Sequence, residues 1–170
     1  MQETTEQYMA RITGYVAGKD HMTVLQSTAN TLAGLVKNAQ ADKLTERPVP
    51  DKWSIAEILA HLAESEIVLA YRLRLVLSAS GTVIQAFDQN VWHDNAGYLN
   101  QDPTEALTLF EALRSSNVAL LKSLSKDQWN KYGMHQERGK ETVARIVEMF
   151  AGHDVNHTMQ IEGIVNGTRK

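Results

Sequence analysis

Apolar residues recur at intervals of three and four along four stretches of the chain, which is the spacing of one helix face. The first stretch predicts a helix over about 21–37, with Asp20 capping its first turn. The second predicts a helix from Ser54 to near Gly81. The apolar positions are Val24, Leu25, Leu32 and Leu35 in the first helix and Ile55, Ile58, Leu59, Leu62, Leu69, Leu73, Val76 and Leu77 in the second.

The start of the second helix has the strongest local signal. Ser54 and Glu57 have the S-x-x-E spacing of a capping box, in which each side chain bonds the backbone N–H of the other residue. Trp53 and Ile58 occupy the two positions of a hydrophobic staple. These residues predict that the helix begins directly after Ser54.

Two further helices are predicted in the C-terminal half. Asp102 and Pro103 fit the cap and the first turn of a third helix, and Glu105 fits its third position. One more turn is expected from Ser125, and the last helix is expected over about 141–165. The apolar positions are Leu109, Leu113, Leu120, Leu121 and Leu124 before Ser125 and Val143, Ile146, Val147, Phe150, Ile161 and Ile164 in the last helix.

The connecting segments lack a helical period. Pro48 and Pro50 argue against a helix in the polar segment around them. Residues 82–101 are expected to form a functional loop or a short irregular helix, and residues 130–140 a loop. No stretch shows a convincing strand alternation. The pattern therefore predicts an all-α four-helix bundle, one domain over 1–170, with room for a short extra helix in the first dozen residues.

Composition narrows the functional classes. The 170 residues are 43% hydrophobic and 22% charged, which is typical of a globular protein, and the net charge of −3 gives no general attraction to nucleic acid or anionic membranes. The N-terminal residues lack the apolar core of a signal peptide, and no apolar run approaches the ~20 residues that span a bilayer, so a cytoplasmic protein is expected. The absence of cysteine excludes disulfides, thiolate metal sites and a cysteine nucleophile.

The segment FAGHDVNH, residues 150–157, places two histidines on the apolar face of the last helix. His153 and His157 continue the face that carries Phe150 and Ile161. Residues at i and i+4 have β-carbons roughly 5–6 Å apart, so two imidazoles there can share one metal ion. The alternative is a pair of buried histidines that only form hydrogen bonds. The glutamate that serves as the base of H-E-x-x-H peptidases is absent, which argues against a zinc peptidase.

A metal site of this kind needs a third protein ligand. His61 lies well inside the second predicted helix, so it can point into the bundle. The sequence favours a surface or capping role for His21, whereas His93 and His135 lie in predicted loops that could reach the site. Glu57 is four residues before His61 and could be a ligand, but its place in the capping box favours a structural role.

Several segments resemble the DinB-like superfamily of metal-binding four-helix bundles, which includes the YfiT-like proteins. The segment DKWSIAEILAHLAESE (51–66) resembles the family's second helix, and FAGHDVNHTMQIEGI (150–164) resembles its last helix. Residues 102–129 and the segment HQERGKET are similar to the family's third helix and the loop that follows it. The resemblance extends over about 21–165.

The resemblance implies a site and a cofactor. The family pattern has one histidine from the second helix and two from the fourth around a divalent metal, often nickel or zinc. These positions fall on His61, His153 and His157. Three imidazoles leave coordination positions open, as in catalytic zinc sites, where a bound water can reach a pKa of ~7 or a thiol can be activated.

Characterised relatives include thiol-dependent S-transferases and a thiol-dependent maleylpyruvate isomerase, so the resemblance implies a metal-dependent thiol transferase or hydrolase-like enzyme. Its substrates would be a small electrophile and a low-molecular-weight thiol, which must come from outside because the chain has no cysteine. Two alternatives remain open. One is a non-catalytic metal-binding module, and the other is a homodimeric interaction module whose interface uses Trp129 and Met149.

Other residues have candidate roles near the site. The aromatic residues Phe87, Trp92 and Tyr98 either form the wall of a substrate pocket or simply pack, and packing is favoured. Asp154 and Gln160 are candidates to orient the imidazoles. Arg114 could meet an anionic substrate, although the pattern favours a solvent-facing side chain.

Overall fold

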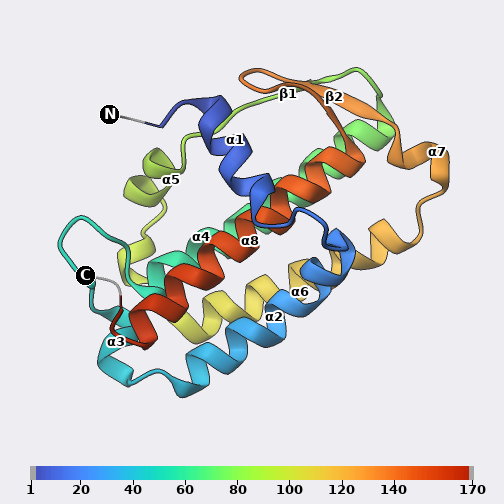
Figure 1. The fold of residues 1–170 in the computed structure, drawn as a ribbon. Coiled ribbons are helices and arrows are strands. Elements are labelled where there is room, and N and C mark those ends of the chain that lie inside the picture. The colour runs from blue at the N-terminus through green and yellow to red at the C-terminus, as the bar shows by residue number, and fades with distance from the viewer. Residues whose placement is uncertain (1–2, 169–170) are drawn as a thin grey trace.

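The structure, a computed structural model, describes residues 3–168, and within them four long helices form a bundle (Figure 1). They are α2 (His21–Asn38), α4 (Ile55–Ser78), α6 (Pro103–Lys122) and α8 (Val143–Val165). The helix α4 packs against α6 and α8, and α2 packs against the same two helices. The four predicted helices are therefore confirmed, with α4 and α2 on opposite sides of the bundle.

Shorter helices connect and flank the bundle. They are α1 (Thr5–Gly14), α3 (Ala41–Thr45), α5 (Gln89–Asn95), the 3-10 helix η1 (Tyr98–Asn100) and α7 (Lys126–Trp129). The extra N-terminal helix and the turn after Ser125 are confirmed, and α3 forms before the prolines in a segment that was expected to be a loop. No helix in the described part of the chain is long and apolar enough to cross a membrane.

The predicted caps form as the residue types require. The Asp20 carboxylate accepts from the Thr23 N–H at the start of α2. Ser54 and Glu57 form the capping box of α4. Asp102 accepts two backbone N–H groups at the start of α6, with Pro103 at the first position. These contacts satisfy N–H groups that have no partner within the helix.

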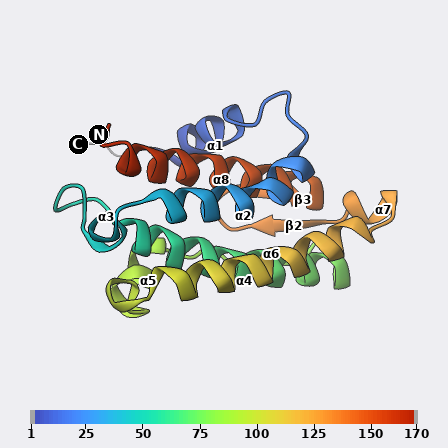
Figure 2. The same cartoon turned by 90° about the horizontal axis from the view of Figure 1, so that it is seen from below.

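The expectation that the chain has no strands is wrong, because the structure contains a small sheet (Figure 2). The strands β1 (Val83–Ile84), β2 (Tyr132–His135) and β3 (Gly139–Thr142) pair in that order, β1 parallel and β3 antiparallel to β2. The buried positions of β2 are Gly133 and His135, so its alternation is not one of apolar residues. The sheet links the chain after α4 to the start of α8.

The buried face of α6 differs from the predicted stripe. Leu109 is 45% exposed, whereas the predicted solvent-facing Arg114 is only 3% exposed, so both expectations are wrong. Both errors have the same cause: polar residues occupy part of the face of α6 that packs against the core. That face consists of Ala106, Leu107, Phe110, Arg114, Asn117, Val118 and Leu121.

The Arg114 guanidinium contacts all three of the other long helices. It donates to Glu66 Oε1 of α4 at 2.8 Å and to both carboxylate oxygens of Asp154 of α8 at 2.5 and 3.0 Å. It also donates to the Leu25 carbonyl of α2 at 2.9 Å. Burial disfavours the charged guanidinium, but the two carboxylates outweigh burial and raise the pKa of Arg114. Burial also raises the pKa of Asp154, although Arg114 opposes the increase.

The close approach of α1 to α8 depends on Gly152. A Cβ at Gly152 would lie 2.2 Å from the carbonyl oxygen of Ile12, which is a backbone atom of α1. Nearby, Arg11 of α1 donates to Asn156 Oδ1 of α8 at 2.9 Å. Figure 1 shows α1 lying across α8. A glycine at this position is therefore required for α1 to cover this part of the bundle.

We expect Arg114→Met to lower the free energy of unfolding by about 3–5 kcal/mol, because it leaves two buried carboxylates without a cation. Urea denaturation would measure the loss. The control is Arg74→Met on the exposed face of α4, which should change stability by less than about 0.5 kcal/mol. A loss at Arg114 no larger than that of the control would contradict the role given to this ion network.

We expect Gly152→Ala to destabilise the protein by about 1–3 kcal/mol, because the added methyl group must displace the backbone of α1. Displaced α1 should also be cut faster by trypsin at Arg11. The matched control is Gly34→Ala in α2, where a Cβ meets nothing within 4 Å and the helix should be unchanged or stabilised by up to about 1 kcal/mol. Equal trypsin sensitivity of the two variants would refute the account of α1 packing.

Candidate metal centre

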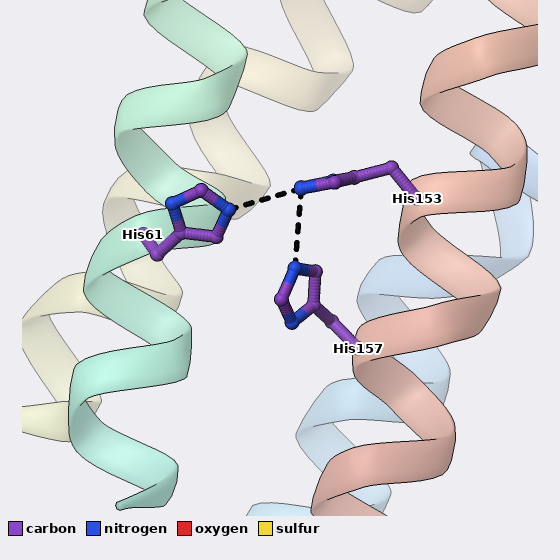
Figure 3. Close-up of side chains that lie close together, drawn as sticks. All are labelled: His61, His153 and His157. Atoms are coloured by element: carbon purple, nitrogen blue, oxygen red, sulfur yellow. Dashed lines mark hydrogen bonds between the residues drawn. The ribbon is translucent and has the colours of Figure 1, made fainter. Parts of the chain in front are cut away.

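Three imidazole rings converge between α4 and α8 (Figure 3). His61 comes from α4, and His153 and His157 come from successive turns of α8. The Nε2 atom of His153 lies 2.9 Å from Nε2 of His61 and 3.1 Å from Nε2 of His157. One ligand atom from each ring lies within 4.8 Å of the other two. His61 and His157 are buried, and His153 is partly exposed.

The hydrogen-bond chemistry of this cluster is unusual for a protein core. Gln160 Oε1 lies 2.8 Å from Nδ1 of His157, and an amide oxygen can only accept, so Nδ1 carries the proton and Nε2 carries the lone pair. The buried Nδ1 atoms of His61 and His153 have no hydrogen-bond partner among residues 3–168. The close approach of these nitrogens fits either N–H···N hydrogen bonds between the rings or a cation that the rings share.

The protonation of the rings suits a metal ion. Burial, followed by the charges of neighbouring histidines, lowers the pKa of His61 and of His153 well below the ordinary value. Both rings are therefore neutral at neutral pH, the form that binds metals. Three nitrogens that are each ~2.0–2.1 Å from one ion would lie roughly 2.9–3.4 Å apart, so the observed separations from His153 fit one shared ion.

The structure brings together the three histidines that the sequence singled out and leaves the others outside the cluster. His21 is the first residue of α2, His93 lies in α5 and His135 lies in β2. The structure shows that His61, His153 and His157 lie close together. Their role as metal ligands stays a prediction.

The two candidates for orienting the imidazoles have different outcomes. Gln160 contacts His157 as expected. The expectation for Asp154 is wrong, because its carboxylate binds Arg114 on another side of α8. Consecutive residues of a helix point about 100° apart, so Asp154 cannot share the direction of His153.

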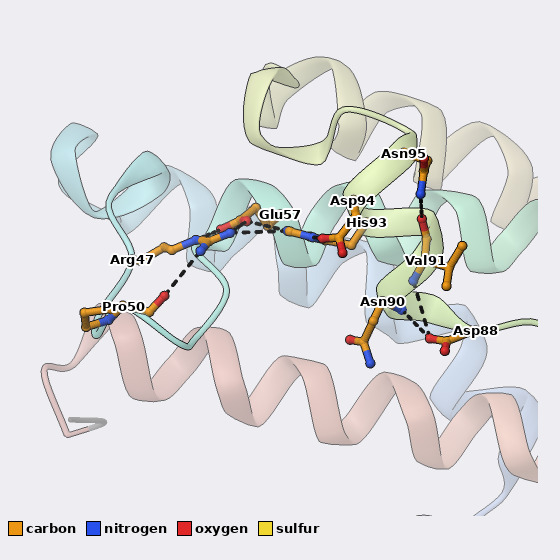
Figure 4. Close-up of polar contacts among 9 residues, drawn as sticks. All are labelled: Arg47, Pro50, Glu57, Asp88, Asn90, Val91, His93, Asp94 and Asn95. Atoms are coloured by element: carbon orange, nitrogen blue, oxygen red, sulfur yellow. Dashed lines mark hydrogen bonds and ion pairs between the residues drawn. The ribbon is translucent and has the colours of Figure 1, made fainter.

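Glu57 is held in a polar network next to the cluster (Figure 4). Arg47 donates to both of its carboxylate oxygens, one of them at 3.0 Å, and His93 Nε2 lies 2.6 Å from Oε1. Burial opposes ionisation, but the hydrogen bonds from Arg47, His93 and Ser54 outweigh it and lower the pKa of Glu57 to about 2. Glu57 is therefore a structural anion, as its capping-box position favoured.

The same network places an aromatic pair over the cluster. Burial lowers the pKa of His93, but Glu57 and Asp94 outweigh burial and raise it, so the ring is a cation over a wider pH range than usual. The His93 ring stacks on Trp53, with centroids 5.2 Å apart and planes 8° apart. Trp53 in turn lies 5.2 Å from the His61 ring. The sequence did not indicate Arg47 or His93 as partners of Glu57.

A cavity of about 310 Å³ reaches the cluster at His157. Trp53 and Ile58, the two residues predicted to form the hydrophobic staple, lie in its wall. Exposed residues also line it, so it is accessible from solvent. The lining residues are Pro48, Asp51, Lys52, Trp53, Ile58, Gln89, Asn90, His157, Gln160 and Ile164.

A second cavity, of about 210 Å³, reaches the cluster at His61 and His153. Gln89 lines both cavities, so the two cavities approach each other at this residue. The residues that line the second cavity are Thr5, Tyr8, His61, Ser65, Arg72, Phe87, Gln89, Glu137, Arg138, Met149, Phe150 and His153.

The aromatic residues of 82–101 divide between the two proposed roles. Phe87 lines the smaller cavity, as a pocket wall requires. Trp92 packs on Phe87 with ring centroids 4.8 Å apart. Tyr98 is fully buried, and its hydroxyl donates to Glu64 Oε2 at 2.6 Å. Packing, the favoured interpretation, therefore describes Trp92 and Tyr98.

The two residues proposed for a dimer interface differ in burial. Met149 is 6% exposed and lines the smaller cavity, so it offers little surface to a partner. Trp129 is partly buried and packs against the hydrophobic core, and its place in an interface stays a prediction. A homodimer itself stays a prediction.

Residues 25–161 match the sequence model of the DinB superfamily. A protein of Oceanobacillus iheyensis is 25% identical over 138 residues, which are 81% of this chain and 79% of the relative. YfiT of Bacillus subtilis is 27% identical over 111 residues, which are 64% of this chain and 62% of the relative. Both relatives carry the name "Putative metal-dependent hydrolase".

Solved structures show the same fold. The structure of YfiT from Bacillus subtilis, described as an unusual four-helix bundle, superposes with a TM-score of 0.80 at 20% identity and covers 98% of this chain and 90% of its own. A mycothiol-dependent maleylpyruvate isomerase superposes with a TM-score of 0.67 at 13% identity. That match covers 83% of this chain but only 59% of the isomerase.

We expect Glu57→Gln to lower stability by about 1–3 kcal/mol at pH 7, because it weakens charge-assisted hydrogen bonds to Arg47 and His93. The folded pKa of about 2 lies below the ordinary 4.5, so the stabilisation is present above pH ~4.5 and disappears as the pH falls toward 2. Urea denaturation of wild type and variant across this range should show their difference shrinking. Glu111→Gln, at an exposed position of α6, is the control and should have little effect throughout. A difference at Glu57 that stays constant from pH 7 to pH 3 would contradict this assignment.

Proposed function

The chain belongs to the DinB superfamily, and we propose that it is a metal-dependent enzyme that uses one divalent ion held by His61, His153 and His157. The reaction we propose is transfer of a low-molecular-weight thiol to a small electrophile. The observation that carries the proposal is the convergence of three Nε2 atoms, two of them 2.9 and 3.1 Å from the third.

The donor set supports a divalent transition metal but does not select one. Imidazole binds zinc, nickel, iron and copper, and we propose nickel or zinc because the family often uses them. Gln160 fixes the tautomer of His157 so that Nε2 faces the other two rings. Burial keeps His61 and His153 neutral and ready to bind.

An open coordination site favours catalysis over a purely structural role. Among the described residues, the cluster contains three potential ligands, whereas structural zinc sites are closed by four. A divalent ion held there would supply Lewis-acid chemistry that lowers the pKa of a bound thiol or water. The surrounding residues would hold the substrates beside it, since each of the two cavities reaches the cluster.

The two cavities favour a reaction between two molecules. One cavity ends at His157 and the other at His61 and His153, so two substrates can approach the cluster from different directions. The chain has no cysteine, so the thiol must be a separate molecule. In the transfer, a bond forms between the thiol sulfur and an electrophilic carbon. With a chlorinated electrophile, chloride leaves with the bonding electrons and the thiol proton passes to solvent. With an epoxide, the ring C–O bond breaks and its oxygen takes up a proton.

Hydrolysis is the second candidate. The names of the relatives from Oceanobacillus iheyensis and Bacillus subtilis support it, and the mycothiol-dependent isomerase supports thiol chemistry. Both reactions use the same site and differ in whether the nucleophile is a thiol or water. We also infer a cytoplasmic location, which a low-molecular-weight thiol would require.

Protein purified without a histidine tag should contain about one divalent ion per chain by elemental analysis. His61→Ala should lose this ion, because it removes the only one of the three donors that α4 contributes to the cluster. His21→Ala, at the first position of α2, is the control and should retain the ion. No bound ion in wild type, or an equal content in His61→Ala, would refute the assignment.

The metal-loaded protein should then consume a thiol such as cysteine, glutathione or bacillithiol together with a chlorinated aromatic or an epoxide. Turnover that requires the metal and the thiol supports transfer. Turnover of an ester without any thiol would replace transfer by hydrolysis. A loaded protein that turns over none of these substrates would contradict an enzyme and favour a non-catalytic metal-binding module.

A further inference from the structure

Arg72 of α4 is a buried cation that lines the 210 Å³ cavity together with His61 and His153. It is only 5% exposed. Its Nη2 donates to the Gln85 carbonyl at 3.1 Å and lies 3.3 Å from Nε2 of His135. No carboxylate within residues 3–168 forms an ion pair with it, which distinguishes Arg72 from the other buried arginine, Arg114.

The carboxylates near Arg72 act on its charge only from a distance. Arg138 lines the same cavity but is bound to Glu141 at 2.7 and 3.1 Å. Glu137 also lines the cavity, on its exposed rim. Burial, followed by the charge of Arg138, outweighs the opposing charges of Glu141 and Glu137 and lowers the pKa of Arg72 to about 10, so the guanidinium is still charged at neutral pH. A buried charge without a counter-ion is costly, and proteins retain one where a ligand compensates it.

A purely structural role would use only part of this side chain. Nη2 makes both of the recorded hydrogen bonds, and the guanidinium lies 5.7 Å from the Phe87 ring. Nε and Nη1 make no hydrogen bond recorded within the described residues, and neither is among the fully buried unpaired atoms. These donors are therefore available to a ligand in the cavity that Arg72 lines.

The position of Arg72 along α4 places its charge at a defined distance from the histidines. Arg72 follows His61 by eleven residues, or three turns, so both lie on one face of the helix, roughly 16 Å apart along its axis. Ser65 lies on the same face and lines the same cavity. Long side chains in helices tend to lean toward the N-terminus, which is the direction of His61 from Arg72 along α4.

We propose that Arg72 binds the carboxylate of a substrate whose reacting atom lies at the histidine cluster, and that the enzyme therefore selects carboxylate-bearing small molecules. This inference rests on the proposed function, because it assumes that the reacting atom of the substrate lies at the histidine cluster. The smaller cavity is lined both by Arg72 and by His61 and His153, so one molecule in it can reach both ends. Arginine and carboxylate form a charge-assisted pair that becomes stronger in a buried site. Tyr8, also in the cavity wall, adds a hydroxyl group near the same end.

The test uses two probes that differ only in charge, mercaptohexanoate and mercaptohexanamide. Each is long enough to reach from the cluster toward Arg72 with its thiol at the histidines. Calorimetric titration of metal-loaded wild type should show the acid binding about tenfold or more tightly than the amide. Arg72→Gln should reduce this preference to about twofold or less while leaving the affinity of the amide unchanged, and Arg72→Lys should retain part of it. Arg74→Gln, on the exposed face of α4, is the control and should behave as wild type.

A second pair of probes identifies which substrate carries the carboxylate. Turnover of chloronitrobenzoate and of chloronitrobenzamide is compared with a neutral thiol as the partner. Suppose that only this pair shows a preference for the acid, and that Arg72→Gln abolishes this preference. The carboxylate then belongs to the electrophile. If only the mercaptohexanoate pair shows this preference and its loss in Arg72→Gln, the carboxylate belongs to the thiol. If wild type shows no preference in either pair, or Arg72→Gln keeps it, the inference is overturned.

A third measurement separates failure of this inference from failure of the proposed function. Metal-free wild-type protein is titrated with hexanoate while the Nε–Hε signal of Arg72 is followed by NMR. A saturable shift of that signal, absent with hexanamide, supports the carboxylate site even if no metal binds the histidines. No shift in the metal-free protein, together with equal binding of acid and amide to the loaded protein, overturns the inference and leaves the metal assignment intact.

Discussion

The structure depends on one buried guanidinium that holds four helices in fixed positions. Arg114 of α6 binds Glu66 of α4, Asp154 of α8 and the Leu25 carbonyl of α2. Ion pairs inside a protein have strict geometry, because any displacement leaves a charge without compensation. Glu66 follows His61 by five residues and Asp154 directly follows His153, so the network sets the separation of the helices that carry the histidines.

On this scaffold the protein arranges two contrasting sets of buried polar groups. The Arg114 network is internally compensated, with donors matched to acceptors. Two rings of the histidine cluster and Arg72 are different, because Nδ1 of His61 and of His153 has no hydrogen-bond partner and Arg72 forms no ion pair with a carboxylate among residues 3–168. His61, His153 and Arg72 line the same cavity. Uncompensated buried groups are characteristic of functional sites, where ligands complete the pairing.

The sequence predicted the parts of this arrangement that depend on local spacing. Helical period and capping residues located all four long helices, and the i, i+4 spacing placed His153 and His157 on the core face of α8. The position of His61 inside the second predicted helix made it the candidate third ligand, and the family resemblance then fell on the same residue. Periodicity could not place Arg114, because arginine is usually exposed and its three partners lie on three other helices. The partners of Glu57 and the pairing of β2 with β1 are also long-range contacts, which no local pattern specifies.

X-ray absorption spectroscopy of the purified, metal-loaded protein tests the central claim most directly. The account predicts a mononuclear divalent ion with three imidazole nitrogens at ~2.0–2.1 Å, the remaining positions being filled by oxygen or by an added thiol. This spectrum should be absent from His61→Ala, because the variant should no longer hold the ion. A metal environment without three imidazoles, or one that is unchanged in the variant, would show that the three rings do not share an ion.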